Sequence, residues 1–82
     1  MRNTTKYFEH TRKRDDRNKI RIEWIESVIQ NPLKTEVQSD GRLRKWGWIE
    51  QEKKFLRVIL LEDGNTLHNA FFDRRFVTGD DK

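Results

Sequence analysis

The sequence predicts one α+β domain in which two N-terminal helices pack on a three- to four-stranded antiparallel sheet. Two observations lead to this prediction. Before Pro32 the apolar residues recur at helical spacing, whereas after it they alternate or run together as in strands, with Asp-Gly turns between the runs. A chain of 82 residues has room for one small core, so we expect a single domain over residues 1–82 with a flexible tail at 77–82.

The helical part of the chain has two segments. Residues 11–18 contain helix-compatible side chains and predict a short first helix. In residues 20–30 the apolar side chains recur at steps of three and four and share one helical face, with Trp24 at its margin. These apolar residues are Ile22, Ile25, Val28 and Ile29. Pro32 disfavours helical geometry at Asn31 and so ends the second helix.

Four later segments predict strands: residues 35–39, 42–50, 55–61 and 66–72. The first is short and is expected at an edge. Within 42–50 the alternation predicts two faces. One carries Arg42, Arg44, Trp46, Trp48 and Glu50, and the other carries Leu43, Lys45, Gly47 and Ile49. The third is apolar at every position except Arg57, which is typical of a central strand.

Composition excludes several classes of function. The chain has no cysteine, and therefore no disulfide framework, zinc ribbon, iron-sulfur cluster or thiol nucleophile. It lacks a Gly-rich phosphate loop and a nucleophile elbow, and His10 and His68 are not at metal-ligand spacing, so we expect no metal and no cofactor. Without an apolar run of roughly 20 residues or a signal-peptide core, a cytoplasmic protein with no membrane contact is expected.

Positive charge is concentrated near the N-terminus. Residues 1–22 hold eight Lys and Arg against three acids, whereas the other sixty residues hold ten against eleven. A positive end of this kind suits a phosphate-rich partner such as RNA. The alternative, a solvated helix surface, has the same composition and stays open.

RNA can be cleaved without a metal by a general base, a general acid and cations that stabilise the charge on phosphorus. His10 is a candidate acid or base, and Arg14 would follow it by one helical turn. Arg57 within its apolar strand requires a carboxylate such as Glu50, an open sheet face or a bound phosphate. The remaining catalytic candidates are His68 and Arg74. For each of them a structural role is the alternative: a packed imidazole for His68 and a solvated guanidinium for Arg74.

A second set of residues is suited to binding nucleic acid. Trp46 and Trp48 share a strand face with two arginines, as in a platform that stacks unpaired bases between cations. The candidates are Arg12, Lys13, Arg17, Arg42, Arg44, Trp46, Trp48 and Arg75. Core packing explains two tryptophans on one face equally well, so both interpretations stay open.

Several short runs resemble a family of small bacterial and archaeal domains grouped with the RelE/ParE-like plasmid toxins, which include the BrnT type. These runs are HTRKR at 10–14, WI at 24–25, VI at 28–29, NP at 31–32, DGR at 40–42 and LRV at 56–58. The ending HNAFFDRRF at 68–76 is similar to compact members of that group and to the wider RelE- and barnase-like nucleases. The resemblance covers the chain from Tyr7 to about Phe76.

The resemblance implies a RelE-like fold, metal-independent cleavage of mRNA, also on the ribosome, and neutralisation by a small co-encoded antitoxin. Residue by residue, it places the family's helix-start His at His10, the following Arg at Arg14 and the central-strand Arg at Arg57. Arg17 and Arg21 depart from the pattern. ParE-like members inhibit gyrase and do not cut RNA, so the resemblance leaves the activity open.

Three hypotheses result: a metal-independent endoribonuclease toxin, a non-catalytic module that holds nucleic acid or a protein target, and an assembly partner of an antitoxin that adds a strand at 35–39. The sequence leaves open whether the chain is an enzyme and whether it forms a homo- or hetero-oligomer.

Overall fold

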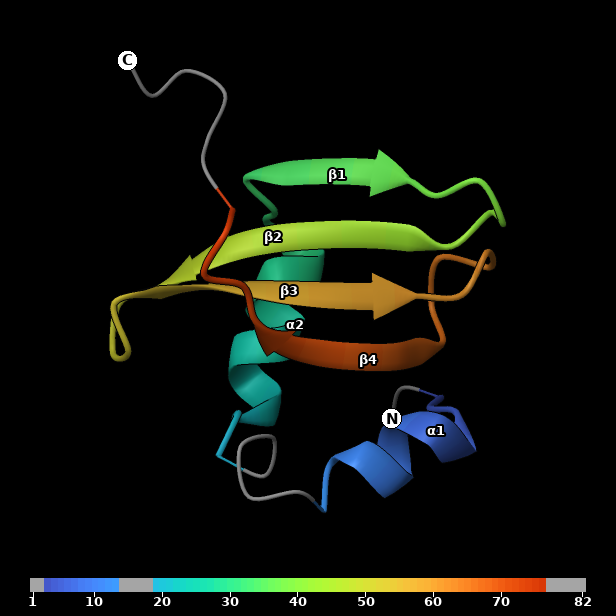
Figure 1. Cartoon of the computed structure of the whole chain (residues 1–82), viewed down its shortest axis with the longest axis horizontal. Helices are drawn as coiled ribbons and strands as arrows, with labels where there is room; N and C mark the ends of the chain where they lie inside the picture. Colours follow the sequence, from blue (N-terminus) through green and yellow to red (C-terminus); the bar gives the residue numbers. More distant parts are fainter. Residues whose placement is uncertain (1–2, 14–18, 77–82) are drawn as a thin grey trace.

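The computed structural model describes residues 3–13 and 19–76, in which two helices precede four strands (Figure 1). The elements are α1 (Lys6–Thr11), α2 (Ile22–Gln30), β1 (Lys34–Val37), β2 (Leu43–Ile49), β3 (Lys54–Leu60) and β4 (Leu67–Phe72). The predicted α+β class and its order of elements are confirmed, with four strands. No helix within the described ranges is long and apolar enough to cross a membrane.

The strands form one antiparallel sheet in the order β1-β2-β3-β4, so each strand pairs with its neighbour in the chain. The two predicted Asp-Gly turns lie at the β1–β2 and β3–β4 connections, where Gly41 (φ 92°) and Gly64 (φ 70°) have positive φ values. Glycine adopts this geometry without steric cost. The turn residues therefore fix the register of both hairpins.

One face of the sheet is covered by α2, which packs on β2 and β3, while α1 packs beside β4 (Figure 1). The buried cluster between these layers consists of Phe8, Ile20, Trp24, Ile25, Val28, Ile29, Ile49, Leu56, Val58, Leu60, Leu67 and Ala70. Trp24 is part of this core, whereas Ile22, which was predicted on the apolar face of the helix, is 48% exposed because it lies in the first turn beyond the edge of the core. A Cβ atom at Gly47 would lie 2.8 Å from Val28 Cγ2, so the absence of a side chain there lets α2 approach β2 closely.

The first helix begins earlier than predicted. It spans Lys6–Thr11, and the residues 12–13 that follow form a turn, whereas residues 14–18 of the predicted helix lie outside the described residues. Thr5 caps it, because Thr5 Oγ1 accepts a hydrogen bond from the Phe8 amide at 3.0 Å. Burial of Phe8 then anchors the helix in the core. The cap and this aromatic anchor explain why the helix begins at Lys6.

β4 contains an extra residue. Ile59 pairs with Asn69 while Leu60 pairs with Leu67, so His68 is inserted between two consecutive ladder positions. Simple alternation along residues 66–72 predicts that His68 shares a face with Ala70 and Phe72, but the extra residue removes His68 from that register, so this prediction is wrong. Leu67 takes that place and is buried with Ala70.

The two edges of the sheet differ. At the β4 edge, residues that precede α1 pair with the strand: the Leu67 amide donates to Asn3 O at 2.8 Å and the Thr5 amide donates to Leu67 O at 3.0 Å. β1 is the other edge, and within the described parts of the chain no strand pairs with its outer side. β1 also confirms the predicted edge strand, one residue earlier than its predicted start.

Candidate nucleic-acid interface

The face of the sheet that α2 leaves uncovered carries aromatic residues and arginines. Lys45, on the α2 side, donates from Nζ to Ile29 O at 3.1 Å, so its neighbours Arg44 and Trp46 point to the opposite face. We call this opposite side the open face. Its aromatic cluster consists of Trp46, Trp48, Phe55, Phe71 and Phe76.

Arg57 lies inside this aromatic cluster. It is opposite Trp46 on β2 and opposite Phe71 on β4. Its guanidinium carbon lies 5.4 Å from the Trp46 ring centre and 5.2 Å from the Phe71 ring centre. Both distances are typical of cation–π contacts. The charged side chain of Arg57 in an otherwise apolar strand is thus explained by its contacts with two aromatic rings.

The carboxylate that balances Arg57 is Asp73, not the expected Glu50. Arg57 Nη1 lies 3.8 Å from Asp73 Oδ2, and both side chains are largely buried. Asp73 Oδ2 also accepts a hydrogen bond from Trp46 Nε1 at 3.0 Å, and Asp73 Oδ1 accepts one from the Arg75 amide at 3.0 Å. Glu50 instead binds Trp48 Nε1 at 2.8 Å and pairs with Lys53.

Two opposed effects act on the pKa of Asp73. Burial raises it, but the hydrogen bonds from Trp46 and from the Arg75 and Phe76 amides, together with the charge of Arg57, lower it below its usual value. Asp73 is therefore a carboxylate at neutral pH. Its charge holds the guanidinium and the indole in fixed positions.

The two tryptophans have different environments. Trp46 is 5% exposed, because the ring of Phe76 stacks on it with centres 5.0 Å apart and an angle of 11°. Trp48 is 44% exposed and meets Phe55 edge-on at 5.0 Å. Neither tryptophan belongs to the core cluster beneath α2. Trp46 packs within the open face, and Trp48 presents its ring to solvent.

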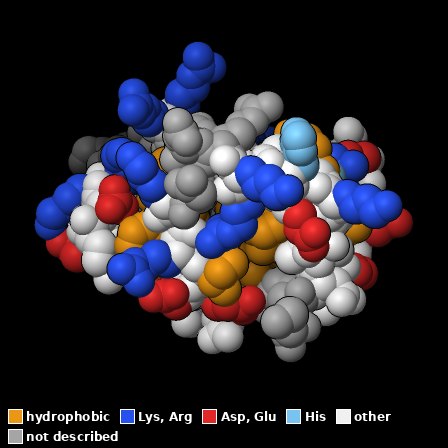
Figure 2. Space-filling model, turned by 90° about the horizontal axis from the view of Figure 1, so that it is seen from below, with side chains coloured by type: hydrophobic (Ala, Val, Ile, Leu, Met, Phe, Trp, Pro, Cys, Tyr) orange, Lys and Arg blue, Asp and Glu red, His pale blue; other side chains and the backbone are white. Residues whose placement is uncertain are grey.

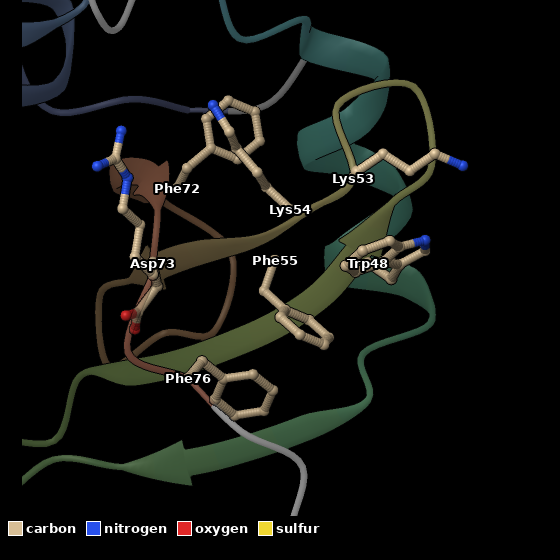
Figure 3. A pocket seen from close by; sticks show the side chains of 8 residues that line it. Trp48, Lys53, Lys54, Phe55, Phe72, Asp73 and Phe76 are labelled. Atoms are coloured by element: carbon tan, nitrogen blue, oxygen red, sulfur yellow. The ribbon is translucent and has the colours of Figure 1, made fainter.

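Phe76 lines two shallow pockets. The first, of about 370 Å³, is lined by Trp48, Lys53, Lys54, Phe55, Phe72, Asp73, Arg74 and Phe76. Figure 3 shows Phe55 between Trp48 and Phe76, with Lys54 extending along the ring of Phe72. The second, of about 320 Å³, is lined by Lys34, Glu36, Trp46, Arg57, Asp73, Arg75 and Phe76. Each pocket combines aromatic walls with cationic side chains.

Arg44 lies two residues before Trp46, on the same face of β2. No hydrogen bond or ion pair is found between its side chain and any other described residue, and its Nε is buried without a partner. The Nε of Arg57 is also buried without a partner. A buried N–H group without an acceptor is costly, so each of these arginines keeps one unsatisfied donor inside the open face.

Charge on the side that Figure 2 displays is dispersed. Lys and Arg side chains cover that surface with Asp and Glu among them and apolar side chains between. Of the basic N-terminal residues, Arg12 packs its guanidinium carbon 5.8 Å from the Phe8 ring centre and Lys13 is exposed. Arg14 and Arg17 lie outside the described residues.

The structure does not bring His10 and Arg57 together. His10 is exposed in the last turn of α1, whose Phe8 packs in the core on the α2 side of the sheet. Arg57 projects from the opposite face. The residues expected to form one catalytic group therefore occupy separate regions.

His68 lies beside the start of α1. Its Nδ1 is 3.0 Å from Thr5 Oγ1, and its ring stacks on Tyr7 with centres 4.8 Å apart. Burial lowers the pKa of His68, the charge of Arg42 lowers it further and the charge of Asp40 partly opposes this. The imidazole is therefore mostly neutral at pH 7, although it is close to a cation.

The other predicted arginines lie at the margins. Arg42 pairs with Asp40 through Nε and Oδ2 at 3.5 Å. Arg74 and Arg75 are exposed after β4, where each lines one of the two pockets. No group of three or more His, Asp and Glu side chains that could hold a metal is present among residues 3–13 and 19–76.

Sequence reasoning missed Phe55, Phe71, Asp73 and Phe76 as members of this site. The alternation of β3 and β4 contained a usable signal, because Phe55 shares its face with Arg57 and Phe71 lies opposite Arg57. The return of Asp73 and Phe76 over the sheet had no such signal. It depends on the path of the chain after β4.

Comparison of the chain with family models, with curated proteins and with solved structures finds no match. The resemblance to RelE/ParE-like toxins therefore depends on the sequence runs quoted above.

Proposed function

We propose that the protein binds single-stranded RNA on the open face of its sheet. The observation that supports this most directly is the exposed ring of Trp48 beside Phe55, on the same face as the guanidinium groups of Arg44 and Arg57. Unpaired bases stack on exposed aromatic rings, and phosphates accept hydrogen bonds from arginine. The two pockets beside Phe76 provide room for such contacts.

Stacking favours a single strand over a duplex. Trp48 and Phe55 lie on a sheet surface, and the bases of a duplex are not accessible to rings presented in this way. Trp46 and Arg57, which are mostly buried, fix the shape of the face. Trp48 and Arg44 then act as the contact residues.

Binding is tested by fluorescence anisotropy with a labelled ten-nucleotide single-stranded RNA at several salt concentrations. We expect Trp48→Ala to weaken binding by about tenfold, since a lost base stack costs about 1–3 kcal/mol. Arg44→Ala should also lower the slope of log K against log salt by about 0.7, which is the loss of one phosphate contact.

Two exposed residues on α1 provide matched controls. Tyr7→Ala removes an exposed aromatic ring and Lys6→Ala removes an exposed cation, both away from the open face. We expect both controls to bind RNA like the wild type. Equal losses in all four variants, or no binding by the wild type at low salt, would refute the proposal.

Metal-independent cleavage of RNA is the second candidate, and one observation favours it. His68 has a lowered pKa, is oriented by Thr5 and lies close enough to Arg42 to respond to its charge. A neutral imidazole near a cation can accept the proton of a ribose 2′-OH as the 2′-oxygen bonds to phosphorus. The P–O5′ bond then breaks, water protonates the departing 5′-oxygen, and the cation stabilises the charge on the phosphate. In this candidate mechanism the reactive groups are His68 and Arg42, and His10 and Arg57 have no part in it.

Cleavage is tested by incubating single-stranded RNA with the protein in excess EDTA and analysing the product ends. If this candidate holds, 2′,3′-cyclic phosphate ends appear and are lost in His68→Ala and Arg42→Ala, while His10→Ala retains activity. If the RNA is bound but stays intact, the protein binds RNA without cleaving it. Either result is compatible with the proposed toxin family and with a small antitoxin that covers the open face.

A further inference from the structure

The outer side of β1 offers backbone groups for pairing with another strand. The Gln38 amide donates to Arg42 O at 2.7 Å across the hairpin. Hydrogen-bonding direction alternates along a strand, so Glu36 and Lys34 pair with β2 while the N–H and C=O groups of Thr35 and Val37 point outward. The β4 edge is different, because residues 3–5 already pair with it.

The side chains of this edge are exposed. Val37 is 69% exposed and Leu33 is 57% exposed, the highest values among the large apolar residues described. Lys34 and Glu36 lie between them, and their Nζ and Oε2 atoms are 3.2 Å apart. An edge strand with exposed apolar side chains is a template for strand addition unless something covers or blocks it.

Residues 33–37 read Leu-Lys-Thr-Glu-Val, and this order is complementary to itself when reversed. With Thr35 opposite Thr35 of an antiparallel second copy, each Lys34 lies opposite a Glu36 and each Leu33 opposite a Val37. A register centred on Lys34 or on Glu36 would instead place two like charges opposite each other, which is unfavourable. Only the register centred on Thr35 pairs all four residues of β1 with complementary partners.

We propose that the protein forms a homodimer in which β1 pairs with β1 of a second copy, with the two-fold axis at Thr35. The Thr35 N–H of each copy donates to the Thr35 C=O of the other, and the two sheets join into one of eight strands. The interface is isologous, as closed dimers require. Both open faces then lie on the same side of the joined sheet. This proposal does not depend on RNA binding.

Sedimentation equilibrium of the full chain without RNA, at moderate salt and over a wide concentration range, tests the dimer. The apparent mass of the wild type should rise with concentration from 10.1 kDa toward twice that value. Lys34→Glu puts four acids at the seam and Glu36→Lys puts four bases there. Each variant alone should dimerise at least about tenfold more weakly, because both attractive pairs become repulsive.

Mixing the two variants gives the decisive result. In an equimolar mixture the acids of one variant face the bases of the other, so the dimer should return to near wild-type strength. Lys6→Glu is the control, since it makes the same charge change on exposed α1 and should dimerise like the wild type. A mixture that stays monomeric overturns the proposal.

Cross-linking provides a second test that does not depend on charge. The chain has no cysteine, so Thr35→Cys introduces one thiol, at the two-fold axis. Paired positions in antiparallel strands lie within disulfide range, so mild oxidation should yield a disulfide-linked dimer. Ser39→Cys, in the turn beyond β1, should yield far less. Equal yields, a wild-type chain that is monomeric throughout, or a different protein found paired with β1 would overturn the proposal.

Discussion

The two faces of the sheet are built from alternate residues of the same strands, yet they differ in chemistry. The face toward α2 is aliphatic and closed, with Leu56, Val58 and Leu60 fully buried. The open face is aromatic and cationic, with Trp48 exposed and Arg57 held between rings. Alternation along the same strands therefore separates a packed face, which stabilises the fold, from a partly exposed aromatic face, which we propose binds RNA. Four experiments test this division and the contacts around it.

The largest effect is expected for Leu56→Ala on the closed face. Removing a fully buried leucine side chain leaves a cavity and should lower the free energy of unfolding by about 2–5 kcal/mol. Trp48→Ala, on the neighbouring strand of the open face, loses mainly the contact with Phe55 and should cost about 1 kcal/mol. Urea denaturation measures both values. Similar losses would show that the open face is also part of the core.

Gly47→Ala should have the second largest effect, because its Cβ would lie 2.8 Å from Val28 Cγ2. Overpacking of this kind costs about 1–3 kcal/mol. The combined variant Gly47→Ala with Val28→Ala relieves the clash and should lose less than the sum of the two single changes. Additive losses in thermal denaturation would mean that the close contact is not the cause.

Asp73→Asn tests the anchor of the open face. The folded state lowers the pKa of Asp73, so this group contributes stability above its unfolded pKa and loses it as pH falls through the folded value. At pH 7 the variant should lose about 1–2 kcal/mol, because hydrogen bonds to a charged group are lost. The wild type should also lose more stability on acidification than the variant. Parallel pH curves would contradict this role.

The smallest effect is expected for His68→Gln. Burial and the charge of Arg42 lower the pKa of His68, so the folded state favours the neutral imidazole. The stability that this preference contributes at pH 8 should therefore be lost as the pH falls through the pKa of His68 in the folded state. The variant should therefore show a flatter stability profile between pH 8 and pH 5 than the wild type. His10→Gln is the control: if the dependence of stability on pH comes from His68, this variant should show the same profile as the wild type.

The sequence was sufficient to predict the helices and strands whose hydrophobic pattern depends only on neighbouring residues. The period of α2, the alternation in β2 and the apolar run of β3 each depend on adjacent residues, and the structure confirms them except at Ile22, which is exposed. The start of α1 was not predicted, because its anchor Phe8 acts through the tertiary core. For the site, Trp48, Arg44 and Arg57 could be found from alternation. Asp73 and Phe76 could not, because they reach the sheet through a chain reversal after β4.

Because His68 is the extra residue in β4, it can be changed or removed without altering how its neighbours pair with β3. Leu67 and Asn69 already alternate correctly across the sheet, so a strand without His68 would keep every other side chain on its present face. The ladder therefore places little constraint on what occupies this position. A chain shortened here by one residue should fold with an uninterrupted ladder and lose only the imidazole beside α1, which separates the chemistry of this residue from the architecture around it.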